Sequence, residues 1–458
     1  MEFLHAQGKK IVNESGQEVI LRGTNIGAWM NMEDFMTGFP GVEHRLRYYA
    51  KQILGEEMGQ YYFDSLSERF FREEDVKYMA SIGINVLRIP VNYRQFEDDM
   101  NPFVYKEEGF KKLEKALDWC EKYGIYAILD LHAAPGWQNC DWHCDNFMRT
   151  ALLWRVKQYQ DRTVALWEEF ARRYKDRAVI AGYDLLNEPT TNNQYTRMPL
   201  TYVSDWDAMN GVYRKLWKAI RAIDTKHTII IEGDHFSVLF NGLDAPYDDN
   251  MMYSNHTYSF VHRFHPEITD KAEYTQAVRD EFYNGEGWKF CQKYNVPLWV
   301  SEFSLDETDQ LDIFKEEGIH WTAWSFKMVY GGGLVNAKQD SPYVQFVAPY
   351  KKNLLGNPYY GVPAQSPEAQ RVTDAILELQ NAIEDCVKPQ IPSFNHISHD
   401  EYFPKTVSDI YYAPLLQYAY LYLFEGIGKN DMDKLMDSFL FENCEVNEEN
   451  LAIYKKYL

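Results

Sequence analysis

The chain has 458 residues, of which 45% are hydrophobic and 16% aromatic, and it carries a formal net charge of −21 at pH 7. This size and composition predict one large globular domain with an appendage, whereas the charge disfavours nucleic acid and anionic membranes, which would repel the protein. No apolar run approaches the ~20 residues that span a bilayer, and the first residues lack a basic stretch followed by an apolar one, so we expect a cytoplasmic protein unless a signal was trimmed away.

From residue 20 to about residue 330, amphipathic helices alternate with short apolar strands, a pattern typical of parallel βα units. The predicted strands are Val19–Thr24, Val86–Pro90, Tyr126–His132, Val179–Asn187, Thr228–Glu232, Met251–His256, Leu298–Glu302 and Thr322–Phe326. Before the third strand, Phe110, Leu113, Leu117 and Cys120 recur at helical spacing and Gly124 ends the helix. Eight such units predict an α/β fold, a closed (β/α)8 TIM barrel whose active site lies at the carboxyl ends of the strands.

Two connections on the predicted catalytic face, residues 31–64 and 133–154, are longer than ordinary βα loops, and such loops often form cleft walls or lids. Residues 340–365 are rich in Pro, Gly and Tyr without periodicity and are expected to lead away from the barrel. We therefore assign residues 1–345 to the barrel, with its N-terminal strands, and residues 346–458 to a linker and a helical extension.

The extension begins with a clear helix signal. Ser366 is a predicted N-cap before Pro367. Five residues then recur at alternating spacings of four and three, which predicts a helix with one buried face: Val372, Ile376, Leu379, Ile383 and Cys386. The segments 407–426 and 430–457 also have helical patterns. We expect these helices to pack on the outer wall of the barrel.

Two glutamates end predicted barrel strands. Glu188 follows the fourth strand in Leu-Leu-Asn-Glu-Pro, and Glu302 ends the seventh in Trp-Val-Ser-Glu-Phe. Retaining hydrolysis of a glycosidic bond needs two carboxyl groups about 5 Å apart, one to protonate the leaving oxygen and one to attack the anomeric carbon. Either glutamate could instead form a structural ion pair with an arginine. Because apolar residues precede both, their burial favours a tuned pKa and a catalytic role.

Several motifs on the strand ends resemble glycoside hydrolase family 5 over residues 15 to 330. They contain Arg88 in Leu-Arg-Ile-Pro, His132 in Asp-Leu-His, Asn187-Glu188-Pro189, His256 with Tyr258, Glu302, and Trp324. The resemblance implies a retaining (β/α)8 enzyme with Glu188 as general acid/base and Glu302 as nucleophile.

The same resemblance implies roles for the other motif residues. Asn187 would hydrogen-bond the sugar 2-hydroxyl, while Arg88 and Tyr258 would keep the nucleophile ionised, since a neighbouring cation lowers a carboxyl pKa. Two histidines, His132 and His256, would line the sugar site, and Trp324 would form its stacking floor. Each residue also has a structural alternative, an ion pair within the barrel or packing in its core.

A narrower resemblance points to the exo-acting β-1,3-glucanase and β-glucosidase branch. Gly27-Ala28-Trp29 followed by Glu33, and the segment from Leu131 to Asn139 that contains Trp137, are similar to that branch. The acid matching Glu33 would read the 4- and 6-hydroxyls of a terminal glucose, which favours exo action. The segment 141–146, with Trp142 and His143, departs from the secreted glucanases. We place these two residues, with Trp137, among the candidate substrate contacts.

Three further patterns have alternative explanations. A zinc site could be formed by Cys140, His143 and Cys144 with two nearby aspartates. However, no second pair of ligands at standard spacing accompanies them. We therefore expect these residues to pack in a lid and to bind no metal. The three glycines at 331–333 lack the Lys-Ser/Thr of a phosphate loop. Glu232 ends the fifth strand and is the rival carboxylate.

The sequence thus predicts a retaining glycosidase that removes terminal β-D-glucosyl residues from oligosaccharides or small glucosides without a cofactor. An endo-acting β-glucanase or β-mannanase is the alternative within the class. A non-catalytic sugar-binding barrel and a metal-dependent barrel hydrolase are alternatives of other classes. The 34 Tyr and 12 Trp favour a carbohydrate partner, because sugars stack on aromatic rings, although an aromatic-rich core would have the same composition. The sequence leaves the aglycone and the oligomeric state open.

Overall fold

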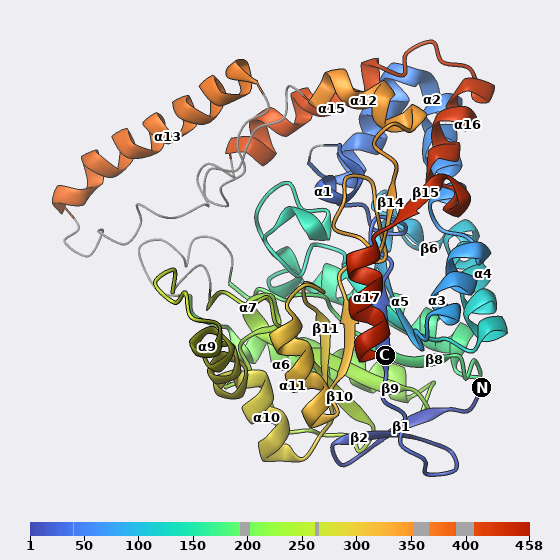
Figure 1. The fold of residues 1–458 in the computed structure, drawn as a ribbon, viewed down its shortest axis with the longest axis vertical. Helices are drawn as coiled ribbons and strands as arrows, with labels where there is room; N and C mark the ends of the chain where they lie inside the picture. Colours follow the sequence, from blue (N-terminus) through green and yellow to red (C-terminus); the bar gives the residue numbers. More distant parts are fainter. Residues whose placement is uncertain (40, 193–201, 262–264, 352–365, 391–406) are drawn as a thin grey trace.

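A computed structural model describes residues 1–458 except 40, 193–201, 262–264, 352–365 and 391–406. Eight parallel strands close into a barrel surrounded by helices, and a helical C-terminal part follows (Figure 1). The barrel strands are β3 (Arg22–Asn25), β4 (Val86–Asn92), β7 (Tyr126–Ala133), β8 (Ile180–Asp184), β9 (Thr228–Glu232), β10 (Met251–His256), β11 (Leu298–Glu302) and β12 (His320–Ala323). The predicted TIM barrel is confirmed.

The helices around the barrel come mainly from the segments between its strands. These helices are α1 (Asp34–Thr37), α2 (Glu43–Phe70), α3 (Glu73–Ser81), α4 (Glu107–Tyr123), α5 (Lys157–Tyr174), α6 (Trp206–Arg221), α7 (Asp234–Ser237), α9 (Lys271–Asn284), α10 (Glu286–Tyr294) and α11 (Thr308–Glu317). The helices after the barrel are α12 (Pro342–Lys351), α13 (Pro367–Val387), α15 (Ala413–Tyr422), α16 (Lys429–Met436) and α17 (Glu448–Tyr457). The additional strands are β1 (Leu4–Gln7), β2 (Lys10–Asn13), β5 (Glu97–Asp98), β6 (Asn101–Tyr105), β13 (Lys327–Met328), β14 (Val335–Ala337) and β15 (Cys444–Val446).

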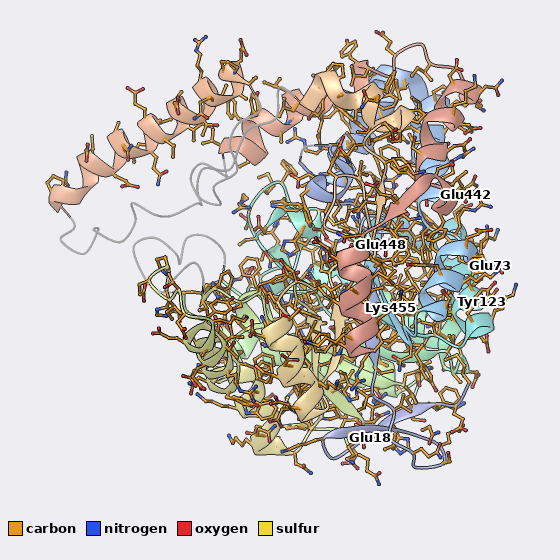
Figure 2. The ribbon with its side chains drawn as sticks, viewed as in Figure 1. Glu18, Glu73, Tyr123, Glu442, Glu448 and Lys455 are labelled. Carbon is orange, nitrogen blue, oxygen red and sulfur yellow. The ribbon has the colours of Figure 1, made fainter. Side chains whose placement is uncertain are left out.

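Helix α4 shows how the pattern becomes structure. The four apolar residues predicted for its inner face are fully buried, and Gly124 ends it with a φ of 73°, a conformation that glycine adopts without strain. On the solvent side, the Tyr123 hydroxyl donates a hydrogen bond of 2.8 Å to Glu73 at the start of α3, and both side chains lie together in Figure 2.

The amino end of the barrel is closed by the hairpin of β1 and β2. Leu4 and Ile11 are each 1% exposed and pack with apolar side chains that point into the barrel bottom. That cluster comprises Leu4, Ile11, Leu21, Val86, Ile128, Ala181, Ile230, Met252 and Trp299. The polar site is therefore confined to the opposite, carboxyl end of the strands.

Five of the eight strands have bounds that differ from the prediction. The second and third end slightly later than predicted, at Asn92 and Ala133. The first barrel strand is Arg22–Asn25 rather than Val19–Thr24, and the fourth is Ile180–Asp184 because the chain leaves the sheet before Asn187. The last strand is His320–Ala323, so Trp324 lies just beyond its end instead of within it. Apolar residues that flank these strands are also buried, so hydrophobicity alone makes the first and fourth strands too long and shifts the last one.

Two segments predicted to be irregular contain helices. Residues 31–64 fold largely into α1 and the 28-residue α2, which bends at Gly55, where φ is 83°. Residues 342–351 form α12, and the rest of the expected crossing segment, 352–365, lies outside the described residues. Helix α2 has a weak amphipathic pattern because α15 and α16 pack on both of its halves in addition to the barrel. By contrast, residues 133–154 form the long loop that was predicted, with only short 3-10 turns.

The C-terminal part packs against the barrel side in several places. The Tyr62 hydroxyl of α2 lies 2.6 Å from the Tyr420 hydroxyl of α15, and Ser65 donates a hydrogen bond of 2.8 Å to Asp433 of α16. Segment 430–457 is not a continuous helix, since β15 pairs with β14 between α16 and α17. The division at residue 345 stays a prediction.

Helix α13 differs from its prediction. Its predicted N-cap is present, because the Ser366 hydroxyl accepts the amide N–H of Ala369 at 3.1 Å. However, the predicted apolar stripe is only partly buried, since Ile376 is buried whereas Leu379 and Ile383 are 52% and 45% exposed, and the helix lies apart from the barrel (Figure 1). In the described ranges, no helix combines the length and the apolar character needed to cross a membrane.

Candidate active site

Glu188 and Glu302 face each other at the carboxyl end of the barrel, with His256 between them. The His256 Nδ1 atom lies 2.7 Å from Glu188 Oε1 and 3.6 Å from Glu302 Oε2. One carboxylate oxygen of each glutamate and one ring nitrogen of His256 all lie within 4.8 Å of one another. Glu302 is 5% exposed and Glu188 is only slightly more open. The structure therefore brings the two predicted carboxyl groups to one point.

Arg88 is the central cation of the site. Its side chain is fully buried on β4, where the guanidinium meets four carboxylates from four other barrel strands at distances from 2.6 to 3.2 Å. These are Asp130, Asp184, Glu232 and Glu302. Buried carboxylates need such a partner. The sequence left two roles open for Arg88, a structural ion pair within the barrel and a contact with Glu302, and the side chain makes both interactions.

Glu302 is held by two donors. Arg88 donates to Glu302 Oε1 at 2.6 Å, and the Tyr258 hydroxyl donates to Oε2 at 3.0 Å. Both contacts agree with the predicted arrangement. Because the guanidinium and the hydroxyl bind different oxygens, together they fix the plane of the Glu302 carboxylate and limit its rotation.

A second group lies beside this pair and forms one side of the mouth. His132 Nε2 is 3.3 Å from Glu33 Oε1 and 3.3 Å from Asn187 Nδ2, while His132 Nδ1 is 2.7 Å from Asp130. The ring of Trp324 stacks on His132 with centroids 5.5 Å apart and an interplanar angle of 16°. The predicted sugar-site residues thus form one continuous network around the carboxyl pair.

Glu232 is a more central residue than the sequence indicated. It is fully buried, accepts a hydrogen bond from Arg88 at 3.1 Å, and accepts the backbone N–H of Glu188 at 2.7 Å. Glu188 has a φ of 46°, a left-handed conformation that is strained for a residue with a side chain. The bond from Glu232 stabilises this turn and so sets the direction of the Glu188 side chain. Its position at a strand end was the only signal for this role.

The long loop between residues 133 and 154 supplies the three remaining predicted contacts. His143 Nε2 lies 3.2 Å from Glu188 Oε2, and Trp142 packs edge-on against the ring of Phe35. Trp137 donates its indole N–H to the carbonyl oxygen of Asp145 at 2.9 Å and so braces the loop. The structure therefore brings His143 directly to the carboxyl pair, whereas Trp137 contacts the loop itself.

The pKa directions of the two glutamates are the reverse of the expected ones. Burial raises the pKa of Glu302 despite the nearby cations His256 and Arg88. Burial would also raise the pKa of Glu188, but the charge and hydrogen bond of His256 outweigh it and lower that pKa. Burial disfavours the charge of His256, yet Glu302, Glu232 and Glu188 together raise its pKa well above the ordinary value. These opposite directions favour the charged form of both Glu188 and His256 in their 2.7 Å contact.

The loop residues considered for zinc have separate partners. The Cys144 thiol contacts the carbonyl oxygens of Asn139 and Asp141 at 3.2 and 3.0 Å, and Asp145 pairs with Arg94 at 2.9 Å. Among the described residues, the single cluster of three possible metal ligands is Glu188, His256 and Glu302. Those two carboxylates and the imidazole are already engaged by Arg88, Tyr258 and one another, which leaves the cluster suited to proton transfer.

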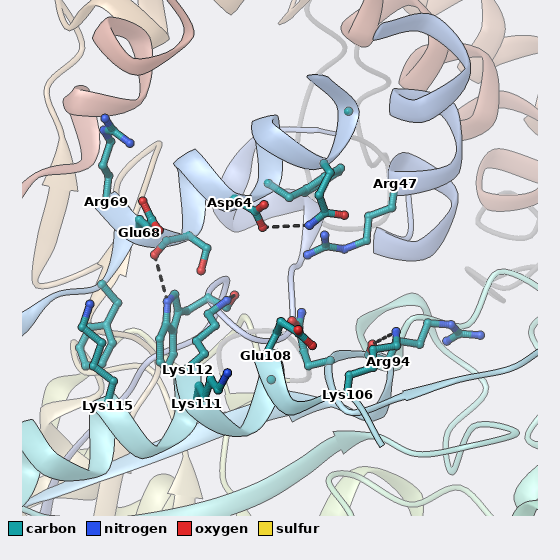
Figure 3. A pocket seen from close by; sticks show the side chains of 18 of the residues that line it. Arg47, Asp64, Glu68, Arg69, Arg94, Lys106, Glu108, Lys111, Lys112 and Lys115 are labelled. Carbon is teal, nitrogen blue, oxygen red and sulfur yellow. Dashed lines mark hydrogen bonds between the residues drawn. The ribbon is translucent and has the colours of Figure 1, made fainter. Parts of the chain in front are cut away.

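A separate cleft of about 1420 Å³ lies on the flank of the barrel between α2 and α4 (Figure 3). Lys111, Lys112 and Lys115 line its α4 side, and Asp64 and Glu68 line its α2 side. Burial lowers the pKa of Lys112 to about 7. The cleft contains none of the strand-end carboxylates described above, so it is distinct from the candidate active site.

Comparison with known proteins gives consistent matches. The family described as "Cellulase (glycosyl hydrolase family 5)" matches residues 57–328, more than half of the chain. A β-xylosidase of Phanerodontia chrysosporium is 34% identical over 97% of this chain and 96% of its own, and a glucan 1,3-β-glucosidase of Pichia angusta is 30% identical over 58% and 59%. The solved structure of an endogalactoceramidase has the same fold, with a TM-score of 0.52 and 19% identity over 73% of this chain and 76% of that one. The chain belongs to glycoside hydrolase family 5 and is a glycoside hydrolase.

Proposed function

We propose that the protein is an exo-acting, retaining β-glycosidase with Glu188 as general acid/base and Glu302 as nucleophile. The observation that carries this proposal is the approach of the two carboxyl groups, whose nearest oxygens lie within 4.8 Å of each other. Retaining glycosidases have carboxyl groups about 5 Å apart, while inverting enzymes need a wider gap for a water molecule. The spacing therefore supports a double displacement.

The reaction proceeds in two steps. In the first, Glu302 attacks the anomeric carbon, the bond to the leaving oxygen breaks, and Glu188 gives its proton to that oxygen. In the second, Glu188 takes a proton from water, whose oxygen displaces Glu302 and releases the sugar with its original configuration. Arg88 and Tyr258 orient Glu302 for the first step through the hydrogen bonds described above.

In this proposal, His256 supplies the proton for the first step through its hydrogen bond with Glu188. The pair shares one proton across 2.7 Å, so a small displacement within this bond places it on Glu188 Oε1. When Glu302 becomes glycosylated it loses its charge, which removes one of the three carboxylates that raise the pKa of His256. The histidine then gives up its proton more readily, and this change couples proton supply to formation of the intermediate.

The surrounding network is proposed to bind the terminal sugar. Trp324 offers a flat ring beneath it, and Asn187 and His132 offer hydrogen bonds to its hydroxyls. Glu33 is 4% exposed and burial raises its pKa, so a sugar hydroxyl would satisfy an oxygen that is otherwise costly to bury. We assign Glu33 to the non-reducing end, which favours exo action, and Trp137 and Trp142 to the loop beside the sugar site.

The preferred sugar is proposed to be β-D-glucose. The motifs around Glu33 support this choice, as do relatives named glucan 1,3-β-glucosidase. Terminal β-xylose is the second candidate, because the relative that matches nearly the whole chain is named β-xylosidase. Relatives named endoglucanase C keep endo action open as a lesser alternative. The cytoplasmic location and the absence of nucleic-acid partners stay predictions from the sequence.

Three substrates test these points together. The purified enzyme would be given phenyl β-D-glucoside, phenyl β-D-xyloside and a β-1,3-linked glucopentaose, and initial rates and product sizes would be measured. We expect the glucoside to be cleaved with the higher kcat/KM and the pentasaccharide to release glucose and tetrasaccharide first. A higher kcat/KM for the xyloside would replace glucose by xylose in the proposal, and early release of disaccharide and trisaccharide would contradict exo action.

A trapping experiment tests the chemistry. A 2-deoxy-2-fluoro β-glycosyl fluoride of the better sugar should inactivate the enzyme and add one glycosyl group to the peptide that contains Glu302. The Glu302→Gln protein should bind the sugar without labelling. Turnover without label would contradict the nucleophile assignment, while binding without turnover by the wild-type protein would support a sugar-binding barrel.

A further inference from the structure

His143 lies on the side of Glu188 that His256 does not occupy. Its Nε2 atom is 3.2 Å from Glu188 Oε2, whereas His256 holds Oε1 at 2.7 Å. His143 is 8% exposed and belongs to segment 141–146, where the sequence departs from the secreted glucanases. The family resemblance therefore assigns no role to this contact.

His143 has a hydrogen bond to its backbone and aromatic neighbours around its ring. The Asn31 side chain donates a hydrogen bond of 3.0 Å to the His143 carbonyl oxygen, and the rings of Trp142 and Phe236 lie 6.2 and 6.1 Å from the imidazole. Phe236 is the middle one of three consecutive non-glycine residues with φ values from 53° to 62°. Such backbone conformations are costly and persist where surrounding structure enforces them, often at functional sites.

The environment disfavours a charge on the imidazole. Burial lowers the pKa of His143, and this effect exceeds the opposing attraction of Glu188, Asp141 and Glu302, while His132 repels a positive charge there. A neutral ring can hold a carboxyl oxygen without adding the charge that would keep Glu188 ionised. Among the described residues, His143 Nε2 has no hydrogen bond of good geometry. Glu188 Oε2 lies 3.2 Å from it, so a slight rotation of the Glu188 carboxyl group would form one.

We propose that His143 is a positioning residue for the acid step, engaging Glu188 Oε2 so that Oε1, which receives the proton from His256, faces the leaving oxygen. This inference rests on the proposed roles of Glu188 and Glu302. With Oε2 held, the O–H bond of Glu188 breaks as the O–H bond of the leaving group forms, and the electron pair of the scissile bond goes to the leaving oxygen. His143 itself exchanges no proton.

Leaving-group dependence distinguishes this role from packing. A phenolate needs protonation, whereas 2,4-dinitrophenolate leaves without it. We would measure kcat/KM of His143→Phe, which keeps a ring without nitrogen, and of His143→Gln, which keeps a donor, on the phenyl and 2,4-dinitrophenyl β-D-glucosides, or on the β-D-xylosides if these are better substrates. We expect His143→Phe to lose about 10- to 100-fold on the phenyl substrate and less than about threefold on the dinitrophenyl substrate, with partial recovery in His143→Gln.

Two parallel variants make the result decisive. Cys144→Ala disturbs the same loop without touching Glu188, so any loss should be equal on both substrates. Glu188→Ala should show the same selective loss as His143→Phe, but larger. An equal loss on both substrates for His143→Phe, or no loss, would overturn the inference. If Glu188→Ala also lacked leaving-group selectivity, the proposed acid role of Glu188 itself would fail.

Discussion

The two ends of the same barrel are built from different chemistry. At the amino end, Leu4 and Ile11 of the hairpin pack with seven other apolar side chains, and the result is an ordinary hydrophobic cluster. At the carboxyl end, Arg88 and two histidines are surrounded by buried carboxylates that constrain one another. The contrast indicates that the amino end stabilises the barrel. The carboxyl end instead buries charged groups that folding alone would not require, as is typical of a functional site.

The largest expected effect comes from removing the nucleophile at the carboxyl end. Glu302→Ala should lower kcat/KM on phenyl β-D-glucoside by roughly 10⁴-fold or more, because the covalent intermediate can no longer form. Arg88 keeps three other carboxylate partners, so the fold should persist. Steady-state kinetics measures kcat/KM, and circular dichroism shows whether the variant is folded. Glu316→Gln on the exposed face of α11 is the control and should keep full activity. Substantial residual turnover would assign the nucleophile elsewhere.

The amino end should respond in the opposite way. Ile11→Ala removes a buried side chain from the hydrophobic cluster and should lower the free energy of unfolding by about 2–5 kcal/mol, since it leaves a cavity. The kcat measured well below the melting temperature should not change, because no catalytic group contacts Ile11. Denaturant unfolding and kinetics would be compared on the same preparation. A fall in kcat with little loss of stability would show that the two ends are coupled.

A smaller effect is expected from one hydrogen bond at the carboxyl end. Tyr258→Phe removes the hydroxyl that donates to Glu302 at 3.0 Å. Hydrogen bonds to charged groups contribute about 1.5–3 kcal/mol, so kcat/KM should fall about ten- to a hundredfold. Tyr283→Phe, whose hydroxyl contacts Glu317 at the surface, is the matched control. Equal behaviour of the two variants would mean that Tyr258 does not orient the nucleophile.

The mildest effect should appear in the pH dependence of stability. Burial disfavours the charge of His132, but Asp130 and Glu33 outweigh it and raise the pKa to about 10. A raised pKa stabilises the fold fully below the unfolded value of about 6.5, and this contribution is lost as pH rises toward 10. The free energy of unfolding should therefore fall over this range, and less steeply in His132→Asn. Identical slopes in the two proteins would contradict the assigned charge.

The sequence predicted most of the barrel because the apolar strands repeat between amphipathic helices with clear ends, as in α4. It failed where apolar segments had other partners. Helix α2 is covered by the C-terminal helices, which weakens its pattern, and α12 contains the proline at 349 that discourages a helical interpretation. The bounds of several strands were misplaced because the residues that flank them are buried as well.

At the site, the motifs located Glu188, Glu302 and their neighbours because the residue types and their strand-end positions follow the chain. They could not reveal that Glu232 holds the Glu188 backbone, which depends on the left-handed turn at Glu188 after β8. Nor could they reveal that His143 reaches Glu188 Oε2, which depends on the conformation of the long loop 133–154. The pKa directions were also beyond the sequence, because they depend on the balance of burial against several charges at once.

The most direct test of the account is the anomer formed first. The wild-type enzyme would act on phenyl β-D-glucoside, or on the xyloside if that is the better substrate, and proton NMR would record the product before mutarotation. With carboxyl oxygens within 4.8 Å, we predict that the β-sugar appears first and that Glu302→Ala produces none. Early appearance of the α-sugar would contradict the two-step mechanism and the role of Glu302.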